Sequence, residues 1–173
     1  KGDPEYVIEM MQDIQDEERF ISKDAIDALS LSLGISKGQL YFSFVQNDTL
    51  FKGETKDKYL HSGSSLPIDN RSIAGYVAKT GEAVLIDDVY HIKSGISYAF
   101  NPAYELKSAY KTTSQLVVPL QTRDGEIVGV LQLINAKDNQ GLVVPFSMKD
   151  RLFISQFSLN AADAIEQARP SRA

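Results

Sequence analysis

Apolar side chains recur along the first thirty residues of the chain at steps of three and four. This spacing places them on one face of a helix, and Gly34 is a residue that commonly ends helices. The pattern therefore predicts a helical amino-terminal region over residues 1–34. The apolar positions are Val7, Met10, Met11, Ile14, Ile21, Ala25, Ile26 and Leu29.

Two hairpins are predicted from runs of strand-forming residues that flank turn signals. Residues 39–46 and 49–55 flank an Asn-Asp pair, which favours a turn between two strands. A second hairpin is centred on Asp124-Gly125. Its second run, "VGVLQLI", is apolar on both faces, which is typical of a central strand covered on both sides. Pro119 has no amide hydrogen, so either the first run is an edge strand or Pro119 marks a point where the backbone nitrogen faces no partner strand.

Two further helices are predicted from caps and periodicity. Ser72 and Gly81 bound a short helix, and "AVLI" after it reads as a strand. The long segment 87–112 has no clean period; we expect an excursion with one or two helical turns near 98–107, and excursions of this length are usually functional or mobile. Ser147 and Asp150 then resemble a capping box before a helix over 148–169. Its apolar stripe comprises Leu152, Phe153, Phe157, Ala161, Ala164, Ile165 and Ala168.

This order of elements predicts an α+β fold, an α/β sandwich. We expect a central antiparallel sheet of five to six strands with helices on its faces. The chain has 173 residues, which suits one domain. It starts without a methionine and stops just after a helical pattern, so we expect residues 1–173 to be a single domain of a longer protein.

Composition and charge narrow the classes of function. The chain is 43% hydrophobic and 24% charged, as in ordinary soluble proteins. A net charge of -5 argues against a nucleic-acid partner. Its apolar runs are too short to span a bilayer and no secretory signal is visible, so we expect a cytoplasmic protein without a membrane partner.

Catalytic and metal chemistry have little support in the sequence. The chain contains no cysteine and two histidines, and neither histidine has a neighbour at metal-ligand spacing. No nucleophile motif or phosphate-binding loop is present. We therefore expect a domain that is not an enzyme and holds neither a metal nor a required cofactor.

Four motifs fall in order along the chain and resemble those of GAF domains. They are "SIAGYVAKTGEAVLIDD", "YKTTSQLVVPL", "DGEIVGVLQLIN" and "PFSMKD". The resemblance is nearest to GAF domains of cyclic-nucleotide phosphodiesterases and of bacterial signalling proteins. It implies a PAS-related fold and a regulatory sensor that binds a small molecule between its sheet and the excursion. It also implies a homodimer formed through terminal helices and an attached output domain.

The phosphodiesterase branch carries a signature of Asn, Lys, Phe, Asp and Glu. Ala136 stands at the Lys position and Arg151 at the Glu position. From the residues themselves, the Asn can bond loop backbone, the Phe can pack under the loop, the Asp can cap the helix, and a nearby Lys can reach that Asp. The residues assigned to the signature are Asn135, Phe146 and Asp150, together with Lys137, which follows the Lys position by one residue.

The resemblance also implies a ligand site, for which a cyclic nucleotide is the leading candidate. A helix start with small residues suits a phosphate, although it is equally a plain cap. Gln132 stands where cyclic-nucleotide binders carry a carboxylate; it reads a ligand or bonds neighbouring backbone. Aromatic residues of the excursion stack on a base or anchor the excursion. The candidate residues are Ile73, Ala74, Tyr98, Phe100, Asn101, Glu105, Ser108, Thr112 and Gln132.

Two alternatives stay open. Glu105, Ser108 and Thr112 share a face if their segment is helical, and that face points either to a ligand or to solvent. The stripes at positions 7–25 and 153–168 suit a helix-helix seam or pack on the domain's own sheet; we expect own-sheet packing for the centre of each helix and a seam for the extreme ends. A ligand-free dimerisation or protein-interaction module is therefore the alternative to a sensor.

Overall fold

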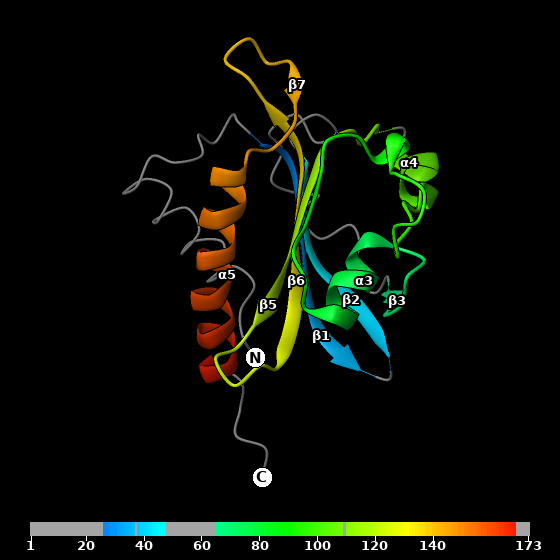
Figure 1. Cartoon of the computed structure of the whole chain (residues 1–173). Helices are drawn as coiled ribbons and strands as arrows, with labels where there is room; N and C mark the ends of the chain where they lie inside the picture. Colours follow the sequence, from blue (N-terminus) through cyan, green and yellow to red (C-terminus); the bar gives the residue numbers. More distant parts are fainter. Residues whose placement is uncertain (1–25, 37, 48–64, 109, 169–173) are drawn as a thin grey trace.

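The fold consists of one antiparallel sheet between two helical layers (Figure 1). The computed structural model describes residues 26–36, 38–47, 65–108 and 110–168. In this part of the chain the strand order is β3-β2-β1-β6-β5-β4, with β7 paired to β6. The strands are β1 (Ile26–Ser36), β2 (Gln39–Asn47), β3 (Ser65–Pro67), β4 (Val84–Ile86), β5 (Gln115–Gln121), β6 (Ile127–Lys137) and β7 (Val143–Val144).

The predicted α+β class is confirmed, and the sheet is larger than expected. It has seven strands in the described residues rather than five to six. The strands absent from the prediction are the 11-residue β1 and the short β3 and β7, which contain three and two residues. Segments this short carry no periodicity, so they are defined only by their hydrogen bonds to neighbouring strands.

The two faces of the sheet carry different helices. The helix α5 (Met148–Ala168) covers one face, and α3 (Ile73–Thr80) covers the other, together with the excursion 87–112. The excursion contains the 3-10 helix η2 (Val89–His91) and α4 (Ala103–Ser108), so a helical turn lies within the expected range and an earlier one was missed. Both α3 and α5 pack on β5 and β6.

The caps predicted for α3 and α5 are present. The amide of Gly75 donates to the Ser72 hydroxyl at 3.0 Å, and Gly81 ends α3 in the left-handed region with φ 74°. At α5 the Ser147 amide donates to Asp150 Oδ2 at 2.6 Å, while the Asp150 amide donates to Ser147 Oγ at 3.1 Å. This reciprocal pair is a capping box with Asp in the usual Glu position.

The strand β6 is buried on both faces, as its apolar run predicts. Leu131 and Leu133 belong to the core beneath α5, and Val130 belongs to the core beneath α3. Pro119 pairs with Val130 of β6 on one side. On the other side β4 does not extend as far as Pro119, because the last pair between β4 and β5 joins Val84 to Val117. The missing amide hydrogen of Pro119 therefore leaves no partner strand unsatisfied, which selects the second of the two interpretations.

The prediction of helix over residues 26–34 is wrong, because this segment is the strand β1. Leu29, Leu31 and Leu33 alternate with small polar residues or glycine, which is a period of two. The strand pairs with β2 and β6, with Leu31 opposite Leu131. Pairing with segments distant in the sequence overrides the local helical steps. The remainder of the helical prediction, residues 1–25, and the predicted strand 49–55 lie outside the described residues.

Asn135 joins the end of β6 to the segment that enters β5. Its backbone adopts φ 57°, a left-handed conformation that asparagine tolerates better than most residues. Its Oδ1 accepts from the Thr113 amide at 2.7 Å, and its Nδ2 donates to the Lys111 carbonyl at 2.9 Å and to the Tyr110 hydroxyl at 2.8 Å. The predicted bonding of Asn135 to loop backbone is thus present, in a residue that is 3% exposed.

We expect Asn135→Ala to lower the free energy of unfolding by about 2–3 kcal/mol. The substitution removes three hydrogen bonds and leaves a buried amide unpartnered. Asn135→Gly is the matched control, because glycine adopts a positive φ freely and should lose about 1 kcal/mol less than alanine. Denaturant unfolding measures both values. Equal stability of Asn135→Ala and the wild type would show that the bonds of Asn135 do not hold the segment.

Candidate functional site

The start of α3 is packed tightly against the chain before it. A Cβ at Gly75 would lie 2.5 Å from the Pro67 carbonyl oxygen, so only glycine permits this approach. The side chains of Ile73 and Ala74 are buried in the apolar cluster beneath α3. Their backbone amides, however, lack intrahelical acceptors, as in every first helical turn. A ligand at this position would therefore be bound by the backbone amides of Ile73 and Ala74 and not by their side chains.

The excursion is fastened by Glu105 of α4. One carboxylate oxygen of Glu105 accepts from the Tyr90 hydroxyl and the other accepts from the Thr112 amide. The Lys111 ammonium lies 5.5 Å from the centre of the Tyr90 ring, in range of a cation–π contact. Glu105 therefore bridges η2, α4 and the approach to β5.

Three titrating groups of this region have displaced pKa values. The hydrogen bond to Glu105 raises the pKa of Tyr90. Burial raises the pKa of Tyr98. The backbone amide of Tyr90, followed by the His91 side chain, lowers the pKa of Asp88, whose carboxylate caps η2. Each shift has a local structural cause, so none of them singles out an acid-base catalyst.

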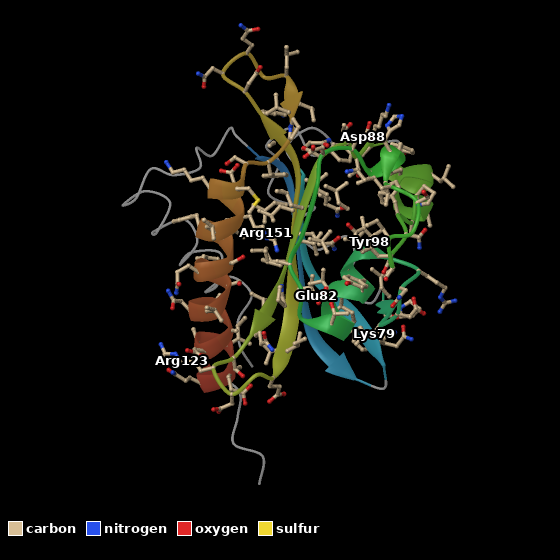
Figure 2. The ribbon with its side chains drawn as sticks, viewed as in Figure 1. Lys79, Glu82, Asp88, Tyr98, Arg123 and Arg151 are labelled. Atoms are coloured by element: carbon tan, nitrogen blue, oxygen red, sulfur yellow. The ribbon has the colours of Figure 1, made fainter. Side chains whose placement is uncertain are left out.

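The aromatic residues of the excursion lie against the α3 side of the sheet. Tyr98 and Phe100 both pack on the cluster beneath α3. The Tyr98 ring centre is 5.0 Å from that of Tyr76, and the Phe100 ring is edge-on to Tyr90 at 5.4 Å. Figure 2 shows Tyr98 on this side and Arg151 on the opposite side of the sheet. The anchoring role expected of these aromatics is present; base stacking stays a prediction.

Two buried amides complete this face of the sheet. Gln132 on β6 is 8% exposed, and its Oε1 accepts from Nε2 of Gln115 on β5 at 3.0 Å. Gln115 was missed from the sequence, although a glutamine that begins an apolar strand was a signal that could have found it. Both residues are polar where their strands are otherwise apolar, so their buried amide groups need hydrogen-bond partners.

The predicted ligand-binding residues do not all lie together in the structure. Asn101 is exposed and its Oδ1 accepts from the Ala103 amide at the start of α4. Glu105, Ser108 and Thr112 were expected to share a face only if their segment is helical, and this condition is not met, because α4 ends at Ser108. Glu105 instead reaches Thr112 by a carboxylate–amide bond. The side chain of Ser108 lies outside the described part of the structure.

The signature residues lie on the α5 side and at the strand end. Phe146 is 4% exposed in the core beneath α5, and Asp150 caps that helix. Lys137 lies at the end of β6, opposite Val143; its ion pair with Asp150 stays a prediction. Arg151, at the Glu position of the signature, donates to the Ala83 carbonyl at 3.1 Å. This bond ties α5 to the connection between α3 and β4.

The described residues show neither a candidate metal site nor a candidate membrane span. There, no group of three or more His, Cys, Asp or Glu side chains is arranged to hold a metal ion. No helix in these ranges has both the length and the apolarity needed to cross a bilayer.

Comparison with known proteins gives one family and several relatives. A family model described as "GAF domain" matches residues 21–165, which is more than half of the chain. A stretch of 83 residues is 39% identical to the dual 3',5'-cyclic-AMP and -GMP phosphodiesterase 11A of Takifugu rubripes. That stretch covers 48% of this chain and 9% of the phosphodiesterase, so the chain spans only a small part of this relative.

Solved structures share the fold at low sequence identity. Residues 122 to 287 of a methyl-accepting chemotaxis protein align with a TM-score of 0.66 and 18% identity, over 96% of this chain and 91% of that one. A type II free methionine-R-sulfoxide reductase from Thermoplasma acidophilum aligns with a TM-score of 0.57 and 16% identity, over 95% and 94%. At these identities the likeness shows the fold alone.

We expect Glu105→Ala to speed hydrogen exchange of the Thr112 amide by roughly tenfold or more, because a hydrogen bond to a charged group contributes about 1.5–3 kcal/mol. Tyr90→Phe is the matched control. It removes the bond to the other carboxylate oxygen and should leave the Thr112 amide protected. Amide exchange followed by NMR measures both. Unchanged exchange in Glu105→Ala would show that Glu105 does not fasten the excursion.

Proposed function

The chain belongs to the GAF domain family, and from this premise we propose that it is a regulatory sensor module. In this proposal a small molecule binds on the α3 side of the sheet, beneath the excursion 87–112. Binding then biases α5, which carries the signal to an attached output domain. The observation that carries the proposal is the placement of the buried amides of Gln115 and Gln132 and of the excursion aromatics on one face of the sheet, with α5 on the other.

A cyclic nucleotide is the proposed ligand. The support is the 39% identity over 83 residues to a phosphodiesterase of cyclic AMP and cyclic GMP. The start of α3 offers amides to a phosphate. Two observations alter how the base of the nucleotide would be recognised. The Glu105 carboxylate already accepts hydrogen bonds from Tyr90 and Thr112 within the excursion, and Gln132 replaces a carboxylate.

The proposed signal route passes through two contacts that join the faces of the sheet. Arg151 of α5 bonds the carbonyl of Ala83, two residues beyond the end of α3 at Gly81. Asn135 bonds the segment that follows α4 and lies at the strand end that leads toward α5. A ligand shifts the helix only if it binds one arrangement of these contacts more tightly than the other.

We propose that the domain itself does not catalyse a reaction. A thiol nucleophile would need a cysteine, and this chain has none. Its other polar clusters have structural partners, as described for Glu105, Asn135 and Asp150. The activity of a longer parent protein would belong to the output domain.

A ligand-free dimerisation module is the second candidate, favoured by an unpartnered apolar stripe on α5. The centre of the predicted stripe packs on the domain's own sheet, as expected, since Phe157 and Ala161 are buried in its core. The exposed face instead carries Met148, Leu152 and Leu159, which are 57%, 68% and 40% exposed. Their spacing of four and seven residues suits a seam with a second copy.

The cyclic-nucleotide proposal predicts thermal stabilisation. At a concentration near 100 times the dissociation constant, cAMP or cGMP should stabilise the folded domain by about 2.7 kcal/mol. For a domain of this size this raises the melting temperature by roughly 5–11 °C. Differential scanning calorimetry measures the shift, with 5'-AMP and 5'-GMP as acyclic controls. No shift with either cyclic nucleotide would remove this ligand class from the proposal.

The dimer candidate predicts a specific loss of association. Leu152→Glu with Leu159→Glu should convert a dimer to a monomer, because two charges would be placed in an apolar seam. Leu106→Glu is the matched control, since Leu106 is 84% exposed on α4. Sedimentation velocity over a range of concentrations measures the state. A wild-type chain that is monomeric throughout would contradict this candidate.

A further inference from the structure

The buried amides of Gln115 and Gln132 face the α3 side of the sheet. Side chains alternate along a strand. Val117 belongs to the cluster beneath α3, whereas Leu116 belongs to the core beneath α5, so Gln115 lies on the face of Val117. By the same alternation Gln132 lies on the face of Val130, which belongs to the cluster beneath α3.

The pair leaves one buried acceptor without a donor. Gln115 Nε2 is engaged with Gln132 Oε1, while Gln115 Oε1 has no hydrogen-bond partner although Gln115 is only 4% exposed. Among the buried side-chain atoms of the described residues, this is the one without a partner. Such an atom is costly to bury unpaired, so it calls for an external donor, either a bound molecule or a trapped water.

The surroundings of this oxygen define the chemistry of its donor. Gln115 is bonded to the uncharged Gln132, and the buried residues of the described ranges include no charged side chain. An amide oxygen accepts hydrogen bonds and repels an anion, so a phosphate or carboxylate does not fit there. Tyr98 and Phe100 pack against the same apolar cluster, which favours a planar group beside the amides.

We infer that Gln115 is a specificity-determining residue that reads an N–H donor on a neutral, planar heterocycle. Gln132 holds the Gln115 amide in position through its Oε1. The inference rests on the proposed ligand-binding function and adds the chemistry of the ligand's buried edge. The exocyclic amine or ring N–H of a purine supplies such a donor.

The binding test uses cAMP, cGMP and purine riboside 3',5'-cyclic monophosphate, which lacks every base N–H donor. Isothermal titration calorimetry is expected to show that the wild type binds the better cyclic nucleotide about tenfold or more tightly than this analogue. In Gln115→Met the preference should fall to about onefold. Gln121→Met is the matched control on the same strand, because Gln121 bonds only the Gly125 carbonyl at the hairpin; it should keep the preference.

The ratio of affinities separates recognition from folding. A general loss of packing in Gln115→Met would weaken all three compounds together and leave the ratio unchanged. An unchanged ratio in Gln115→Met would overturn the inference even if the cyclic-nucleotide proposal stands. If neither cAMP nor cGMP binds the wild type, the cyclic-nucleotide proposal fails, and a stability measurement on the unliganded chain then decides the inference.

That measurement uses the double variant Gln115→Met, Gln132→Met. It removes the unpaired acceptor and its partner together, so it leaves no new orphaned group. If the pair is retained for a ligand, the unliganded double variant should melt several degrees above the wild type. If a trapped water already satisfies the pair, the double variant should melt at the same temperature or lower, which would overturn the inference.

Discussion

Burial of β6 on both faces is the constraint on which the rest of this structure depends. The strand contributes to the core beneath α5 and to the core beneath α3, and it is flanked by β1 and β5. A strand in this position has no solvated side, so every polar group on it needs a partner within the protein. Gln132 and Asn135, the two polar residues of its inner stretch, are therefore bonded to β5 or to the segment that enters it.

These partnerships make the polar groups of β6 the points where the excursion meets the sheet. Asn135 bonds Tyr110, Lys111 and Thr113, and Glu105 bonds the Thr112 amide between them. The excursion is thus fastened at its carboxyl end by buried or half-buried hydrogen bonds. Because α3 and α5 pack on the same two strands, a change on one face has a short physical path to the other. The bond of Arg151 to Ala83 adds a direct link at the β4 edge.

Much of the fold could be predicted because its patterns are local. The caps at Ser72 and Ser147, the hairpin at Asp124-Gly125 and the two-sided run of β6 each need only a few neighbouring residues. The sequence predicts helix at the start of β1, because the first apolar residues of this strand also fit the spacing of three and four residues that is typical of a helix. Its alternation of leucine with serine was the better signal. The strands β3 and β7 are too short to have a period, so only pairing defines them.

The candidate site was less predictable, because hydrogen-bond partners distant in the sequence decide it. The sequence by itself determined which residue types are present: a chain without cysteine, polar residues within apolar strands, and an excursion rich in aromatics. Only the tertiary structure decided that Glu105 fastens the excursion, that Asn101 bonds the first amide of α4, and that Gln115 keeps an unpaired oxygen. Periodicity reports which face a side chain occupies, whereas a hydrogen bond depends on which distant group the fold places within about 3 Å of it.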